Sequence, residues 1–129
     1  MRSVPFKDVV AVLADLVEKT NVVLPPDVLG AISRAGEAEH SGLACSILDQ
    51  IVENAHIAAE ESLPLCQDTG IAVYFIDMGE NVRVEPPGIG EAVREATRRG
   101  YREGGFRMSV VQDPLRRANT GDNTPPMIH

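Results

Sequence analysis

Length, composition and charge limit what this chain can be. It has 129 residues, of which 43% are apolar and 24% are charged, and a formal net charge of −7 at pH 7. An acidic balance of this size argues against nucleic acid as the main partner. The chain has no run of about 18 apolar residues, so no membrane span is predicted. The first eight residues lack the pattern of a secretory signal. We therefore expect a cytoplasmic chain with one domain over residues 1–129 and no second domain.

The charge is distributed unevenly along the chain. The segment 83–117 contains eight arginines and five acidic residues, which makes it net +3 and leaves the remainder at −10. A basic zone in an acidic protein can attract an anionic substrate or an acidic partner surface. The alternative is an ordinary solvated helix face, which we favour for Arg94, Arg98, Arg99 and Arg102.

Helical periodicity dominates the first half of the sequence. Ser3 can cap a helix over residues 5–19, in which apolar residues recur at helical spacing: Val9, Val10, Leu13, Leu16 and Val17. A second helix is predicted from Pro25 and Pro26 to about Gly36, because proline is tolerated in the first turn of a helix. Ser41 can cap a third helix that ends near Glu61 and has an apolar stripe that includes Ala44, Ile47, Leu48, Ile51 and Val52.

The second half of the sequence predicts strands and one more helix. Residues 71–76 form a short continuous apolar run that predicts a buried strand, with residues 82–84 as its partner strand. A fourth helix is expected over residues 90–103 and another strand over residues 108–111, whereas residues 113–129 are turn-like. The fold class that we predict is therefore α+β, a helix-rich N-terminal half followed by a small β-sheet with one further helix.

Three places along the chain could carry chemistry. The first is Cys66-Gln67-Asp68-Thr69-Gly70, where a thiolate could bind a soft metal or a cluster, although a lone cysteine before a strand is more often a small buried hydrophobe. The second is Arg107, whose guanidinium matches a carboxylate, although a single loop arginine is more often a surface residue. The third is residues 119–124, Asn-Thr-Gly-Asp-Asn-Thr, which could present donors to an anion or form a well-capped turn.

Cys45 and Cys66 are the two cysteines, and they do not form a Cys-x-x-Cys motif. A disulfide framework is implausible in a cytoplasmic chain. Each cysteine is therefore a packing residue, a reactive thiol, or one ligand of a metal site that is completed elsewhere. Cys45 falls in the third predicted helix near its apolar stripe, where we expect buried packing.

Two motifs together carry a family resemblance. Pro64-Leu-Cys-Gln-Asp-Thr-Gly-Ile-Ala-Val resembles the cysteine segment of class I fumarases and of the related L(+)-tartrate dehydratase alpha subunits. Asp113-Pro-Leu-Arg-Arg-Ala-Asn-Thr-Gly-Asp-Asn-Thr-Pro-Pro resembles a downstream segment of the same family. The order of the motifs, their spacing and the intervening arginine agree with the family, and the resemblance covers essentially the whole chain.

The resemblance implies an iron–sulfur hydro-lyase that interconverts fumarate and (S)-malate, as in the tricarboxylic acid cycle. In this family three cysteines hold a 4Fe-4S cluster whose open iron acts as a Lewis acid on the substrate. By resemblance, Cys66 is a cluster ligand, Gln67 and Asp68 contact the substrate, and Asp68 also handles a proton. Arg107 is expected to clamp a substrate carboxylate. The pocket is expected to be shaped by Asn119, Thr120, Gly121, Asp122 and Asn123.

The other two ligand cysteines of the family lie beyond residue 129. We therefore expect this chain to be the N-terminal part of an alpha subunit, inactive alone and without the cluster. The expected partners are the dicarboxylate substrate, a beta subunit or C-terminal domain of the same enzyme, and further copies in a homo-oligomer. A tartrate dehydratase alpha subunit is the alternative enzyme.

Two alternative interpretations lie outside this family. Asp68-Thr69-Gly70 is the signature of aspartic proteases, but that fold is nearly all β and three amphipathic helices before Asp68 contradict it. The second alternative is a non-catalytic module for subunit assembly. It would be favoured if the chain bound a beta subunit but no ligand.

Overall fold

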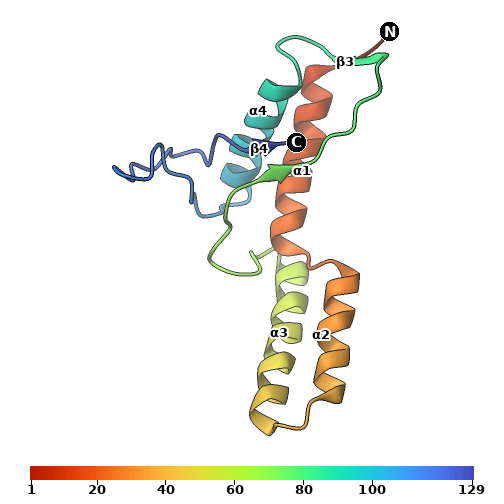
Figure 1. Ribbon diagram of the computed structural model, residues 1–129, viewed down its shortest axis with the longest axis vertical. Coiled ribbons are helices and arrows are strands. Elements are labelled where there is room, and N and C mark those ends of the chain that lie inside the picture. The colour runs from red at the N-terminus through yellow and green to blue at the C-terminus, as the bar shows by residue number, and fades with distance from the viewer. The chain divides into compact units, whose positions relative to one another are not determined.

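The computed structural model describes residues 1–129 and has an α+β architecture, as predicted (Figure 1). Four helices and four short strands follow in the order β1 (Arg2–Val4), α1 (Phe6–Val22), α2 (Pro26–Ala38), α3 (Gly42–Glu61), β2 (Val73–Tyr74), β3 (Val82–Val84), α4 (Ile89–Glu103) and β4 (Met127–Ile128). The chain divides into two compact units. We call residues 19–67 the helical unit, and residues 1–18 with 68–129 the composite unit.

The helical unit contains helices α2 and α3, which lie side by side (Figure 1). Ser41 is at the N-cap position of α3, but its side chain makes no capping hydrogen bond. The carboxylate of Glu39 binds the backbone at this end of the helix instead. It accepts hydrogen bonds from the amides of His40 and Ser41 at 2.8 and 2.9 Å. These bonds, chiefly the one from Ser41, lower the pKa of Glu39.

Helices α1 and α4 form the core of the composite unit. Val10 and Ala14 of α1 are buried against Ala92 and Ala96 of α4. The crossing is close because a Cβ atom on Gly100 would lie 2.7 Å from the Cβ atom of Val17 and 3.0 Å from the carbonyl oxygen of Ala14. Small residues on α4 therefore set how closely the two helices approach.

Two parallel two-stranded sheets complete the composite unit, and they correct the strand predictions. Strand β3 lies at the predicted residues, but its partner is β1 rather than residues 71–76, with Arg2 opposite Val82. The predicted strand over 71–76 shortens to β2, which pairs with β4, and it is not buried, since Phe75 is 82% exposed. Both pairings join residues more than 50 positions apart, so no local pattern identifies them.

The remaining differences concern ends and loops. Helix α1 continues three residues beyond the predicted end at Lys19, to Val22. Residues 108–111 form no strand, and only an isolated antiparallel bridge joins Val111 to Asn119. Cys45 is only half-buried, and its thiol lies 3.6 Å from the carbonyl oxygen of Glu39. None of the helices is both long and apolar enough to cross a membrane.

Candidate functional site

Cys66 and Gln67 close the helical unit just after α3. Two hydrogen bonds hold the preceding residue: the Leu65 amide donates to the Asn21 carbonyl at 2.9 Å, and the Asn54 side-chain amide donates to the Leu65 carbonyl at 2.9 Å. The backbone is thus fixed immediately before the thiol. Both Cys66 and Gln67 are exposed, so the alternative of a buried packing cysteine is wrong for Cys66.

Asp68, Thr69 and Gly70 open the second segment of the composite unit. The Gly70 amide donates to the Asp68 carboxylate at 3.3 Å, which makes a local turn, and Gly70 has a φ of 60° that favours glycine. The Thr69 hydroxyl donates to the Arg107 carbonyl at 2.5 Å. This bond brings two of the predicted site segments together, although they are 38 positions apart in sequence.

Arg107 follows a turn that is anchored to the end of α4. The Phe106 amide donates to the Tyr101 carbonyl at 3.0 Å, and the two rings meet edge to face with centroids 6.0 Å apart. Phe106 is buried, whereas the Arg107 side chain is exposed and forms no ion pair within the chain. The guanidinium is therefore available to an external carboxylate.

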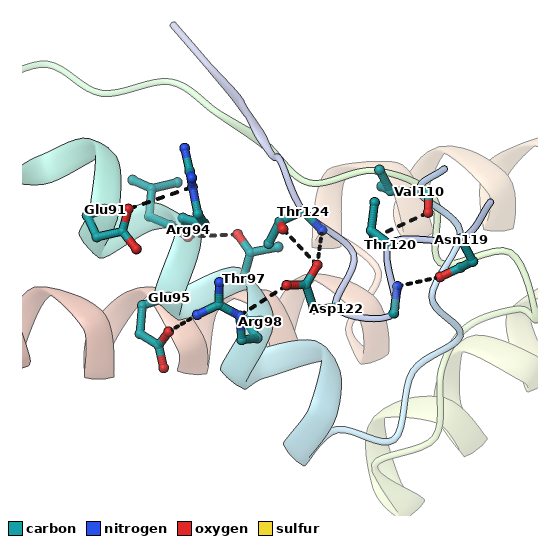
Figure 2. A network of polar contacts seen from close by, with 12 residues as sticks. Glu91, Arg94, Glu95, Thr97, Arg98, Val110, Asn119, Thr120, Asp122 and Thr124 are labelled. Carbon is teal, nitrogen blue, oxygen red and sulfur yellow. Dashed lines mark hydrogen bonds and ion pairs between the residues drawn. The ribbon is translucent and has the colours of Figure 1, made fainter. Parts of the chain in front are cut away.

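Residues 119–124 form a loop held by its own polar side chains (Figure 2). The Asn119 oxygen accepts a hydrogen bond from the Gly121 amide at 2.7 Å, and its side-chain nitrogen donates to the Met108 carbonyl at 2.7 Å. Thr120 bonds to Val110 through its amide at 3.0 Å and its hydroxyl at 3.3 Å. The loop is thus a well-capped turn that is also attached to the segment after Arg107.

Asn123 links all three predicted segments inside the composite unit. Its side-chain oxygen accepts from the amides of Ser109 and Val110 at 2.6 and 2.9 Å, and its nitrogen donates to the Gly70 carbonyl at 3.1 Å. The residue is fully buried and adopts a φ of 56°. A buried amide with these partners fixes the relative positions of the backbone around it.

Asp122 connects the loop to helix α4 (Figure 2). One carboxylate oxygen accepts from the Arg98 guanidinium at 3.1 Å, and the other accepts from the hydroxyl and the amide of Thr124 at 2.7 and 3.1 Å. Partial burial opposes ionisation, but the bonds from Thr124 and Arg98 outweigh it and lower the pKa of Asp122. The carboxylate is therefore charged and already paired within the chain.

The sequence does not identify Tyr101 or the contact of Arg98 with Asp122. Arg94 and Arg99 confirm the prediction of a solvated helix face, since each is exposed and paired with an acid on its own helix, Glu91 at 3.8 Å and Glu103 at 2.9 Å. Arg98 also pairs with Glu95, but it reaches Asp122 as well. The sequence held no sign of that contact, because the partner lies 24 positions away.

An iron–sulfur cluster fits this chain at one ligand position. The exposed thiol of Cys66, on a backbone held by Asn54, is the donor type that such a cluster requires. Cys45 lies nine residues before Asn54 on α3, roughly 14 Å along the helix axis at 1.5 Å per residue. Because Asn54 holds the backbone next to Cys66, Cys45 is too far from Cys66 to share a cluster with it. No three side chains of His, Cys, Asp or Glu come together as a metal site. The other ligands would have to come from outside these residues.

Comparisons with known proteins point to one family. The family model described as fumarate hydratase (Fumerase) matches residues 10–129. Over 119 residues the chain is 35% identical to a protein named as an L(+)-tartrate dehydratase alpha subunit in Methanocaldococcus jannaschii, covering 88% of this chain and 41% of that protein. Over 109 residues it is 34% identical to a protein named as a class I fumarate hydratase in Geobacillus stearothermophilus, covering 84% of this chain and 21% of that protein. The chain thus spans less than half the length of these relatives.

Proposed function

Because this chain belongs to the fumarate hydratase (fumarase) family, we propose that it is the N-terminal part of an iron–sulfur hydro-lyase that hydrates fumarate reversibly to (S)-malate. Both units would belong to one domain of an alpha subunit in the complete cytoplasmic enzyme. One observation of the composite unit supports this proposal most. The Thr69 hydroxyl bonds to the Arg107 carbonyl, and the Asn123 side chain bonds to the backbone of Gly70 and Ser109. These bonds gather the predicted segments and leave the side chains of Asp68 and Arg107 exposed.

The reaction requires a proton and a hydroxyl group to be handled on adjacent carbons. In the dehydration of malate, a base removes the C–H proton, the C–O bond breaks, and the hydroxyl group leaves as water after gaining a proton. Asp68 is the proposed carboxylate for proton handling. Its side chain is exposed at the start of the segment and is oriented by the Gly70 amide.

Substrate carboxylates require fixed cationic and neutral donors. Arg107 would bind one carboxylate through its forked guanidinium, and the Gln67 amide would add a neutral donor. From the loop, Asn119, Thr120 and Gly121 would form a wall of the pocket. Asp122 and Asn123 would support that wall rather than bind substrate, because their polar atoms already have partners within the chain.

Cys66 is the proposed cluster ligand in this chain. When bound, the cluster would supply the Lewis acid that polarises the hydroxyl group. The remaining ligands are proposed to come from a later part of the alpha subunit or its C-terminal domain. A beta subunit and further copies of the enzyme are the proposed protein partners, since the Methanocaldococcus relative is named as an alpha subunit.

Tartrate is the second candidate substrate. It is favoured by the Methanocaldococcus relative, which is named for tartrate dehydration and matches the larger share of this chain. Loss of water from tartrate gives an enol that becomes oxaloacetate. Each of the two substrates has two carboxylates, one of which Arg107 would bind. The residues that distinguish the two diacids would lie outside the described site.

The test uses the complete enzyme, reconstituted anaerobically with iron and sulfide. We expect the ultraviolet absorbance of fumarate to fall as malate forms. The Cys66→Ser variant should lose both the absorbance of the cluster and the activity. Tartrate is assayed in parallel through its oxaloacetate product, so the faster substrate decides between the candidates. Full activity in Cys66→Ser would contradict the proposed ligand. A stable cluster and malate dehydration by residues 1–129 alone would contradict the expectation that these residues are inactive without the rest of the enzyme.

A further inference from the structure

Helix α4 reaches both site segments of the composite unit through two side chains that no motif identifies. The Tyr101 hydroxyl donates to the Thr69 carbonyl at 2.7 Å, and the Arg98 guanidinium donates to the Asp122 carboxylate at 3.1 Å. Tyr101 is buried, at 2% exposure. The first bond holds the main chain directly after Asp68, and the second holds the loop at residues 119–124.

The helix is itself fixed in place within this unit. Residues 98 and 101 are three positions apart on α4, so both side chains leave the same side of a rigid element. Gly100, between them, packs against Val17 of α1 so closely that a Cβ atom there would lie 2.7 Å from the Cβ atom of Val17. The spacing between the two site segments is therefore set by a helix that is fixed against another helix.

We infer that Arg98 and Tyr101 are positioning residues that set the distance between the segment of Asp68 and the 119–124 loop. This inference rests on the proposed function, because the two segments matter together only if they hold one dicarboxylate. Neither side chain needs to touch the substrate. Loss of either anchor would displace one segment relative to the other, and a misplacement of about 1 Å can cost about a hundredfold in catalysis.

The chain offers a matched control for each anchor. Tyr74→Phe is the control for Tyr101→Phe, because each variant removes one tyrosine hydroxyl. The Tyr74 hydroxyl bonds to Thr97 Oγ1 on α4 at 2.9 Å, and this bond holds no site segment. Arg94→Gln is the control for Arg98→Gln, since Arg94 lies on the same helix and pairs only with Glu91. In Figure 2, Arg94 and Arg98 lie on one helix and only Arg98 points to Asp122.

The experiment measures kcat and KM of the complete reconstituted enzyme, normalised to cluster content, with hydrogen exchange of the same samples. In Tyr101→Phe we expect KM for fumarate to rise about tenfold, with faster exchange at residues 68–72. In Arg98→Gln we expect a smaller rise in KM, with faster exchange at residues 119–124. The KM of Arg98→Lys should lie between those of the parent and Arg98→Gln. A purely structural role would lower the amount of active enzyme and leave KM unchanged.

Each outcome separates the inference from the proposed function. If the parent enzyme hydrates fumarate and KM of both anchor variants stays within about twofold, the inference is overturned and the proposed function stands. Equal changes in the anchor and control variants would also overturn the inference. A parent enzyme that contains its cluster but acts on neither fumarate nor tartrate would overturn the proposed function instead.

Discussion

The helical unit and the composite unit bury very different parts of their sequences. In the helical unit, α2 has no buried residue and α3 buries only Ala55 and Ala58. In the composite unit, α4 alone buries Ala92, Val93, Ala96, Thr97, Gly100 and Tyr101. The helical unit is also the more acidic, since residues 19–67 contain seven acidic and two basic residues, a net charge of −5, which leaves −2 for the rest of the chain.

The two units also differ in which residues they join. Helices α2 and α3 are neighbours in sequence, so short-range periodicity is enough to specify them. The composite unit joins residues 1–18 to residues 68–129, and side-chain hydrogen bonds such as that from Asn123 to Gly70 span 53 positions. The comparison teaches that local signals determine the helical unit, whereas long-range polar contacts determine the unit that carries most of the candidate site.

The largest expected effect comes from glycines in helices of the two units. Gly100→Ala should lower the free energy of unfolding by about 2 to 3 kcal/mol, because the new Cβ atom meets Val17 at 2.7 Å. Gly36→Ala in α2 should be neutral or raise it by up to about 1 kcal/mol, because the nearest atom lies 3.7 Å away. Urea unfolding measures both variants. Equal destabilisation would mean that the two units are packed alike.

Asparagines provide the next comparison. Asn123→Ala should cost about 1 to 3 kcal/mol of unfolding free energy, because it leaves partly buried backbone groups of Gly70, Ser109 and Val110 without these partners. Asn54→Ala in the helical unit removes one exposed hydrogen bond, to Leu65, and should cost about 1 kcal/mol or less. The same urea titration checks this difference. A cost at Asn54 as large as that at Asn123 would contradict it.

Hydrogen exchange tests the comparison without any substitution. Amides of α2 and α3 should exchange about tenfold faster than those of α4, because elements with few buried side chains open locally at lower free energy. Exchange followed by mass spectrometry at neutral pH, on peptides from each helix, gives the ratio. If α4 exchanges first, burial does not set local stability in this chain.

The smallest expected effect concerns the Asp122–Arg98 ion pair. Because the pKa of Asp122 is lowered below its ordinary value of 3.8 in the folded chain, its stabilising contribution is present above that value and is lost as the pH falls through the folded pKa. Asp122→Asn should therefore lower the unfolding free energy at pH 7 by about 0.5 to 1 kcal/mol, since the pair is partly exposed.

The same variant should differ less from the parent near pH 2.5 than at pH 7, because protonation of Asp122 begins to remove its contribution once the pH is below 3.8. Urea unfolding at the two pH values measures the difference, with Asp77→Asn, at an exposed position of the same unit, as the control. A cost for Asp122→Asn that does not depend on pH would show that the ion pair contributes nothing through ionisation.

Elements that depend on local signals follow the prediction from the sequence. The helices were predicted to within three residues at each end, because apolar spacing and prolines act over a few positions. Cys66 and its neighbours were identified as a possible site from the resemblance, and their exposure agrees with a role beyond packing. The roles of Asp68, Arg107 and the loop stay predictions until activity is measured.

The strand pairings and the anchors of the site could not be predicted in this way. Residues 71–76 have the apolar, β-branched character of a buried strand, yet only Val73 and Tyr74 pair, and their partner is the last part of the chain. Asn123 was expected to shape a pocket, but its hydrogen-bond partners around residues 70 and 110 depend on how distant backbone segments meet.

By itself, the sequence determined the helices, the α+β class and the family, because periodicity, proline positions and the two motifs are properties of neighbouring residues. Tertiary structure alone decided that β1 pairs with β3, that Asn123 is buried among three segments, and that Arg98 and Tyr101 hold two of them. The physical reason is that a hydrogen bond across 24 to 53 positions depends on how distant segments and helices pack together, and Gly100 allows that packing to be close.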